Sequence, residues 1–463
     1  MTPSRFPASL GDARWWTPTQ RATASHILGR EFLWVVVGQG TAALGAVVGI
    51  CLLTRALPPS AYGKLALGLT AATFAQQTLF SPLSAAALRY FAPAREAGEL
   101  GPYFRSIRAL AWNAFLLLTG AGIAALVLLL ALDGGAWLRL TAGAVVFAAL
   151  VGACSLLDGV QNAARQRAVV AWHDGVAPWA RFLLAVALVA ALGASGDAAM
   201  TGFVAATALL LASQWWFYHR RLAHIRCRHE PERPEDTTRW RGTLFDYGWP
   251  FVTWGLFSWA QLASDRWALE AFVSTQAVGL YAVLFQVGYY PMTLLSGLLS
   301  QLLVPVLFAR AGDGRDPARF DDARRLNRRL LVLMAAFTAT GVAGATLVHR
   351  PLFALLVAPE YRVMSGLLPA VVAAGGLFAC GQAAALTLLS AGTSRRLLGP
   401  KVATGLLGIA LNGVGAALWG VQGVVAANVL TAVAYVSWVL LVAESGGVSE
   451  AAPAGRVVLR PNE

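Results

Sequence analysis

Apolar runs long enough to cross a bilayer recur along the whole chain, and they constrain its fold more than any other feature. A membrane-spanning helix needs about 20 mostly apolar residues, because the hydrocarbon core is about 30 Å thick. The sequence is 57% hydrophobic and only 13% charged, which is too little polar surface to cover a soluble fold. We therefore predict an all-α, polytopic membrane helix bundle of about twelve spans. The apolar windows lie near 31–54, 64–88, 106–132, 137–157, 178–194, 199–218, 244–264, 278–308, 328–348, 363–391, 397–418 and 421–443.

The positions of Lys and Arg support about twelve spans with both termini in the cytoplasm. Cytoplasmic segments of membrane proteins are enriched in these two residues. With both ends inside, only six of the 36 basic residues fall outside, in outer segments that are all short. These six are Arg55, Lys64, Arg139, Arg266, Arg350 and Arg362. The remaining positive charge is scattered over several inner loops without a stacking array of aromatic residues, so it does not indicate a nucleic-acid partner.

A weak internal repeat suggests two halves of similar build. Moving the segment 61–110 forward by 216 positions, so that Gly63 meets Gly279, gives ten identities in fifty residues. Both segments have a Gly-led helix start, a centre of small residues and a basic exit loop. We expect two six-helix lobes related by an axis along the membrane normal. The predicted parts are a cytoplasmic arm (1–30), an N-lobe (31–218), a basic cytoplasmic linker (219–243), a C-lobe (244–443) and a cytoplasmic tail (444–463).

Three short segments carry motifs at the ends of the predicted spans. In 52–67, an Arg-x-Leu precedes a Pro-bearing turn and a Tyr-Gly. Asp265 and Arg266 stand ahead of a Val-Gly-Leu-Tyr, and Asn412 precedes the Gly-rich turn of 419–424. These motifs resemble those of the bacterial polysaccharide flippases. The resemblance implies the multidrug, oligosaccharidyl-lipid and polysaccharide exporter superfamily, with two six-helix lobes, a central cavity and alternating access.

The resemblance predicts a transporter and not an enzyme. Its expected activity is to flip an isoprenoid-pyrophosphate-linked oligosaccharide across the bacterial inner membrane for surface polysaccharide biosynthesis, with that substrate and membrane lipids as partners. One alternative is a cation-coupled exporter of small amphipathic compounds, which is less favoured because the N-lobe windows hold few acids beyond Glu31 and Asp158. A polysaccharide polymerase or ligase is less favoured still, because the short outer loops supply no catalytic cluster of acid, base and nucleophile.

Cations and amides inside the spans are the candidate substrate-binding groups. The planar fork of arginine suits a pyrophosphate, and amide side chains suit sugar hydroxyls. The candidates are Arg266, Asp265, Arg89, Arg181, Gln39, Gln76 and Gln286. No cofactor or metal site is expected, because the four cysteines lie far apart and the histidines near 219–229 lack ligand spacing. A coupling ion is left open.

Each candidate also has a structural interpretation. Arg89 and Arg181 could be anchors that reach the membrane surface. Arg266 could form a helix-end ion pair with Glu270, and the glutamines could join helices by hydrogen bonds. Pro82 and Pro291 are predicted gating kinks, for which the alternative is a passive bend.

Overall fold

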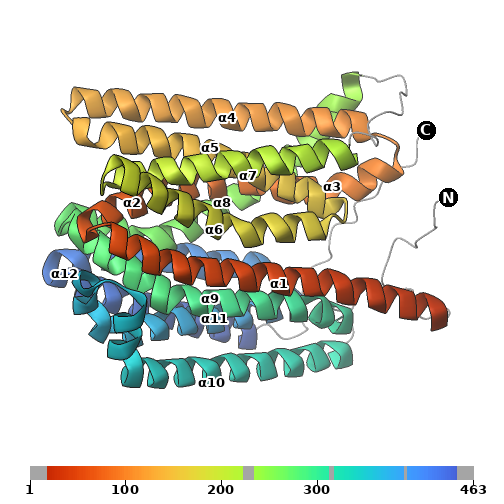
Figure 1. The fold of residues 1–463 in the computed structure, drawn as a ribbon. Helices are drawn as coiled ribbons and strands as arrows, with labels where there is room; N and C mark the ends of the chain where they lie inside the picture. Colours follow the sequence, from red (N-terminus) through yellow and green to blue (C-terminus); the bar gives the residue numbers. More distant parts are fainter. Residues whose placement is uncertain (1–17, 223–233, 312–316, 391–393, 446–463) are drawn as a thin grey trace. The chain divides into compact units, whose positions relative to one another are not determined.

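The computed structural model describes residues 18–222, 234–311, 317–390 and 394–445, and every regular element in those ranges is a helix (Figure 1). The predicted all-α class is confirmed there. Parts of three predicted segments lie outside the described residues. They are 1–17 of the arm, 223–233 of the linker and 446–463 of the tail.

All twelve predicted apolar windows fall on helices of the structure. The elements are α1 (Pro18–Ala56), α2 (Pro59–Ala75), the π-helical turn η2 (Gln76–Phe80), α3 (Ser81–Glu96), α4 (Leu100–Ala131), α5 (Gly135–Ala163), α6 (Arg167–Leu192), α7 (Gly196–Leu222), α8 (Pro234–Phe272), α9 (Thr275–Ala311), α10 (Pro317–Leu356), the 3₁₀ turn η4 (Pro359–Leu367), α11 (Leu368–Ser390), the 3₁₀ turn η5 (Ser394–Leu397) and α12 (Leu398–Ser445).

Nine segments of the described chain are long and apolar enough to span a membrane, against the twelve predicted. The window 64–88 is divided among α2, η2 and α3, and α8 is not among the nine. The windows 397–418 and 421–443 both lie in α12, which is bent at Gly420 (φ 59°, ψ −134°). Only glycine adopts this conformation readily, so the single segment contains two helical halves.

The described residues form two compact units. Unit 1 comprises residues 1–282 and 353–362, and unit 2 comprises residues 283–352 and 363–463. The predicted lobes, 31–218 and 244–443, stay a prediction.

Unit 1 is built from helices that pack along much of their length. α1 packs along α6, α6 packs along α7, and α5 contacts α3, α4 and α7 (Figure 1). Small residues allow this close packing, as is common between membrane helices. A methyl group on Gly202 of α7 would lie 2.4 Å from Cα of Ala185 in α6.

The first turns of α2 and α9 also meet in unit 1. Gly63 of α2 lies against the carbonyl of Thr275, and Gly279 of α9 lies against the carbonyl of Pro59. The contact is so close that neither position has room for a Cβ atom.

Unit 2 is centred on α11. Gly288 of α9 packs against Val371, and Gly376 of α11 lies against the side chain of Thr338 in α10. α12 packs along α11, and a buried apolar cluster joins α9, α10 and α11, with Val436 of α12 packed against it. That cluster contains Leu307, Leu330, Met334, Cys380, Ala383 and Leu386.

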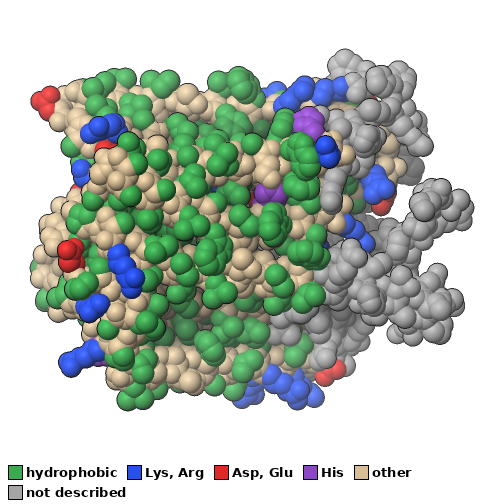
Figure 2. Space-filling view, viewed as in Figure 1, with side chains coloured by type: hydrophobic (Ala, Val, Ile, Leu, Met, Phe, Trp, Pro, Cys, Tyr) green, Lys and Arg blue, Asp and Glu red, His purple; other side chains and the backbone are tan. Residues whose placement is uncertain are grey.

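Large apolar side chains are exposed on helices of both units. Leu117 of α4 is 63% exposed and Leu441 of α12 is 66% exposed, and hydrophobic side chains cover much of the face drawn in Figure 2. Such a surface suits hydrocarbon and not water. The protein is a multi-pass membrane protein.

Candidate functional site

A π-helical turn interrupts the path from α2 to α3. It covers Gln76–Phe80, directly before Pro82. Proline lacks an N–H and its ring crowds the carbonyl four residues earlier, here that of Thr78. The predicted kink at Pro82 therefore coincides with a local change of helix type, a feature that recurs at functional sites. Gln76 is the first residue of the turn and is half-buried. The gating role of Pro82 stays a prediction.

Asp265 and Arg266 form a buried cluster with Tyr281 in unit 1. Asp265 is 1% exposed and Arg266 is 9% exposed. The Tyr281 hydroxyl donates to Oδ2 of Asp265 at 2.6 Å, and Nη1 of Arg266 donates to Oδ1 at 3.3 Å. The guanidinium also lies over the Tyr281 ring, 5.8 Å from its centroid, within the range of a cation–π contact.

The alternative ion pair between Arg266 and Glu270 is not what the structure shows. Arg266 pairs with the neighbouring Asp265 and donates to the carbonyl of Leu262 at 2.8 Å. Glu270 instead accepts a hydrogen bond from the hydroxyl of Thr275 at 2.8 Å. The Arg266 side chain thus points back toward the preceding turn of α8 and not forward to Glu270.

Arg181 belongs to a polar region between α5, α6 and α7. Its Nε donates to the Thr207 hydroxyl at 3.1 Å, and its guanidinium lies 5.5 Å from the ring centroid of Phe147. Gln214 of α7 donates to the Asp158 carboxylate and to the Gln161 amide oxygen of α5. A carboxylate, an arginine and two buried amides are thus held by three helices that are otherwise apolar.

The sequence windows missed the start of α6. The predicted span was 178–194, whereas α6 begins at Arg167 and is a candidate span over its whole length. The first three turns carry Arg167, His173 and Asp174, which lower their hydropathy. His173 and Asp174 therefore lie inside the span. Nδ1 of His173 bonds the carbonyl of Val169 at 2.8 Å, and Nε2 meets the Ser213 hydroxyl at 3.1 Å.

Unit 2 contains a buried cation that sequence reasoning assigned to a cytoplasmic loop. Lys401 is 3% exposed, and its Nζ lies 5.1 Å from the Phe378 centroid and 5.4 Å from the Tyr435 centroid. The Tyr435 hydroxyl donates to Oε1 of Gln382 at 2.9 Å. The signal was present in the sequence, because Lys401 shares a buried helical stripe with Thr404, Gly408 and Asn412.

The other candidates are dispersed. Gln39 is half-buried in α1, and Arg89 is exposed on α3. In unit 2, Gln286 is half-buried, and Pro291 is exposed on α9, which continues through it without a break. Among the described residues of unit 1, no hydrogen bond or ion pair joins Gln39, Gln76, Arg89 or Arg181 to the pair at 265–266.

A polar joint outside the apolar spans ties α8 to the turn before α4. Glu99 accepts hydrogen bonds from the Arg239 guanidinium and from Nε1 of Trp240, the latter at 2.8 Å. The hydrogen bond from Arg239 holds the pKa of Glu99 below its usual value of 4.5. The same bond raises the pKa of Arg239.

Residues 28–310, well over half of the chain, match the model of the family described as polysaccharide biosynthesis protein. The chain belongs to this family. The matched range includes the π-helical turn, the α5–α7 polar region and the buried Asp265–Arg266 pair. No curated protein sequence matches the chain.

Solved structures show that this family member has the fold of the MOP superfamily. The lipid II flippase MurJ in an inward closed conformation is similar with a TM-score of 0.67 and 11% identity, over 89% of this chain and 87% of MurJ. An inward-facing multidrug resistance MATE transporter has a TM-score of 0.60 and 14% identity, over 88% and 94%. The Vibrio cholerae MATE transporter VcmN has a TM-score of 0.60 and 13% identity, over 92% and 98%. The predicted family is thus confirmed by the family match, and the predicted fold by these structures.

Proposed function

We propose that the protein flips an isoprenoid-pyrophosphate-linked oligosaccharide from the inner to the outer leaflet of the bacterial cytoplasmic membrane, by alternating access. The observation that carries the proposal is the family match over residues 28–310, since the family is one of polysaccharide biosynthesis. Sugars for the cell surface are built on lipid carriers and must cross the membrane. A chain composed of apolar helices with little outside them suits that step.

Cations held among the apolar helices support an anionic substrate. Charged groups inside a membrane are costly and are retained where they do work. Arg181 and Arg266 lie in unit 1, and Lys401 lies in unit 2, each among apolar helices. Because arginine forms bidentate, charge-assisted hydrogen bonds with phosphate oxygens, the two arginines suit the pyrophosphate.

Aromatic and amide groups beside Lys401 support a sugar. The rings of Phe285 and Tyr289 are stacked at 4.4 Å, and those of Phe378 and Tyr435 are stacked at 5.4 Å. Aromatic faces pack against the apolar faces of sugar rings, and amides such as Gln382 hydrogen-bond their hydroxyls. We assign Gln39, Gln76, Arg89 and Gln286 the same supporting role, with Pro82 and Pro291 as gating positions.

A genetic test distinguishes transport from biosynthesis. Deleting the gene should abolish the surface polysaccharide and cause the lipid-linked oligosaccharide to accumulate on the cytoplasmic side, measured by its protection from an added impermeant glycosidase in spheroplasts. Complementation with Asp265→Asn/Arg266→Gln, which removes both charges, should fail. Arg139→Gln changes an arginine whose side chain is 89% exposed and should complement. A deletion strain with normal surface polysaccharide and no accumulated intermediate would refute the proposal.

Cation-coupled export of small amphipathic compounds is a second candidate, favoured by one observation. Asp174 lies inside α6 and Asp158 lies in α5, so the membrane helices of unit 1 hold more acid than the sequence windows suggested. Under this alternative, deletion should increase drug sensitivity while leaving surface polysaccharide intact. The same strain therefore separates the two candidates.

A further inference from the structure

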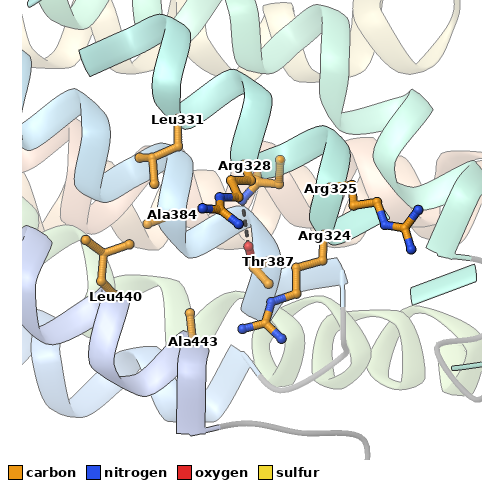
Figure 3. A pocket seen from close by; sticks show the side chains of 9 residues that line it. Arg324, Arg325, Arg328, Leu331, Ala384, Thr387, Leu440 and Ala443 are labelled. Atoms are coloured by element: carbon orange, nitrogen blue, oxygen red, sulfur yellow. Dashed lines mark hydrogen bonds between the residues drawn. The ribbon is translucent and has the colours of Figure 1, made fainter. Parts of the chain in front are cut away.

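A cavity of about 550 Å³ opens between α10, α11 and α12 in unit 2, apart from the groups discussed above (Figure 3). Its wall combines three arginines of α10 with a buried amide and several apolar side chains. The lining residues are Arg324, Arg325, Asn327, Arg328, Leu331, Ala384, Thr387, Leu440 and Ala443. These arginines of α10 belong to the basic 310–329 segment, which the charge distribution predicts to be cytoplasmic.

Two of the arginines concentrate positive charge on the cavity. Arg324 and Arg328 extend from α10 toward the part of α12 that carries Leu440 and Ala443, whereas Arg325 extends the other way (Figure 3). Arg325 also has a carboxylate partner, because Nη1 lies 4.0 Å from Oδ1 of Asp322. Among the side chains that the structure describes, none forms an ion pair with Arg324 or Arg328. Like charges one helical turn apart repel, so an anion between them is stabilising.

The floor of the cavity holds a buried acceptor that lacks a protein donor. Asn327 is 3% exposed, and its Nδ2 donates to the carbonyl of Ala383 at 3.0 Å and to the Thr387 hydroxyl at 2.6 Å. These bonds fix the amide orientation. Oδ1 of Asn327 is buried and accepts no hydrogen bond from the described residues. A ligand that pairs with this atom must carry a hydroxyl or ammonium donor.

The remaining wall is apolar and continues into lipid-facing surface. Leu331, Ala384 and Leu440 line the cavity, and the next positions along the same helices, Val332 and Leu441, are 61% and 66% exposed. A bound molecule could therefore place its charged end between the arginines while its hydrocarbon part stays in the bilayer.

We propose that this cavity binds the phosphate headgroup of a membrane lipid. Arg324 and Arg328 hold the phosphate, and Asn327 accepts a hydrogen bond from a donor on the headgroup. A phosphatidylglycerol of the bilayer and an isoprenyl diphosphate carrier both supply the phosphate, and of these two only phosphatidylglycerol also supplies hydroxyl donors. Binding of the isoprenyl diphosphate carrier rests on the proposed transport function, whereas binding of phosphatidylglycerol does not. If the protein binds phosphatidylglycerol but does not transport the oligosaccharide, this proposal still holds.

The test is a binding titration on the purified full chain in a neutral detergent. The probes are short-chain phosphatidylglycerol, isoprenyl diphosphate, short-chain phosphatidylcholine and inorganic phosphate, with native mass spectrometry reporting the bound fraction. The test variant is Arg324→Gln/Arg328→Gln. The matched control is Arg329→Gln/Arg350→Gln, which also removes two charges from α10 but at side chains that do not line the cavity. All four residues are exposed, so the substitutions leave the fold intact.

Parent and control should bind the anionic lipids alike. The double variant should bind them about 25-fold more weakly, since each basic residue near an anionic lipid contributes about fivefold. Whichever of phosphatidylglycerol and isoprenyl diphosphate binds the parent protein more tightly identifies the lipid class that the cavity takes. Four outcomes overturn the proposal: equal affinity in all three proteins, equal loss in the control, inorganic phosphate binding as tightly as the lipids, or no anionic lipid binding to the parent above phosphatidylcholine.

Discussion

Gly63 and Gly279 occupy equivalent places in the internal repeat and pack against each other's helices in a reciprocal way. A methyl group on Gly63 would lie 1.9 Å from the carbonyl oxygen of Thr275, and one on Gly279 would lie 1.8 Å from that of Pro59. The offset of 216 that relates the two glycines also relates Pro59 to Thr275, the first residues of α2 and α9. The weak sequence repeat thus has a structural counterpart within unit 1.

Gly279→Ala should destabilise the protein by about 1–3 kcal/mol, the usual cost of overpacking, because Cβ would overlap a backbone carbonyl that cannot rotate away. Thermal unfolding in one detergent measures the effect. Gly40→Ala is the control, since nothing lies within 4 Å of a Cβ there. Its unfolding midpoint should stay the same or rise, because alanine favours helix over glycine. Equal midpoints for both variants would contradict the packing described.

Arg266→Ala should cost more stability than Asp265→Asn/Arg266→Gln. The single change leaves a carboxylate that is 1% exposed without its cation, whereas the double change leaves two neutral amides beside Tyr281. Breaking one side of a buried pair costs about 3–5 kcal/mol in soluble proteins. Thermal unfolding midpoints rank the two variants, and a single variant at least as stable as the double one would show that the pair contributes little.

Lys401→Met should leave the protein at least as stable while abolishing transport. The substitution keeps the apolar stem and removes a charge that is costly to bury. The unfolding midpoint and the surface polysaccharide of a complemented deletion strain give the two readouts. Arg396→Met, on the half-buried turn before α12, is the control and should complement. If the Lys401→Met variant restores the surface polysaccharide fully, Lys401 does not take part in transport.

Acid should weaken the joint between α8 and the turn before α4. The pKa of Glu99 is lowered in the folded protein, so its stabilisation is fully present above about pH 4.5, the ordinary value, and is lost as pH falls through the folded pKa. The midpoint of the parent should therefore fall more steeply below pH 4.5 than that of Glu99→Gln. Identical slopes would mean that the Arg239 bond does not contribute to stability.

Most of the fold follows from the spacing of apolar residues, because a helix is the only way to bury an isolated backbone segment in hydrocarbon. The errors have local causes. The predicted fifth span begins at residue 178 and so excludes Asp174, whereas α6 starts at Arg167 and runs through Pro178. Lys401 is counted with the cytoplasmic basic residues, yet it lies inside α12 and is buried.

The candidate site was predicted only in part. The adjacent residues Asp265 and Arg266 stood out as charges near the end of an apolar window, and the structure buries both. Tyr281 belongs to the same sequence motif, but its hydrogen bond to Asp265 could not be predicted, because the turn between α8 and α9 separates them and the contact arises from tertiary packing. The π-helical turn could not be predicted either, because Pro82 indicates a kink but not the type of helix that forms there.

The α2–α9 crossing also makes the two repeats depend on each other. In an isologous dimer, residue i of one copy touches residue j of the other, and j touches i in return. Gly63 with Thr275 and Gly279 with Pro59 satisfy this rule inside a single polypeptide. A substitution at either glycine therefore disturbs the first turn of both helices, so these two positions of the repeat are constrained together.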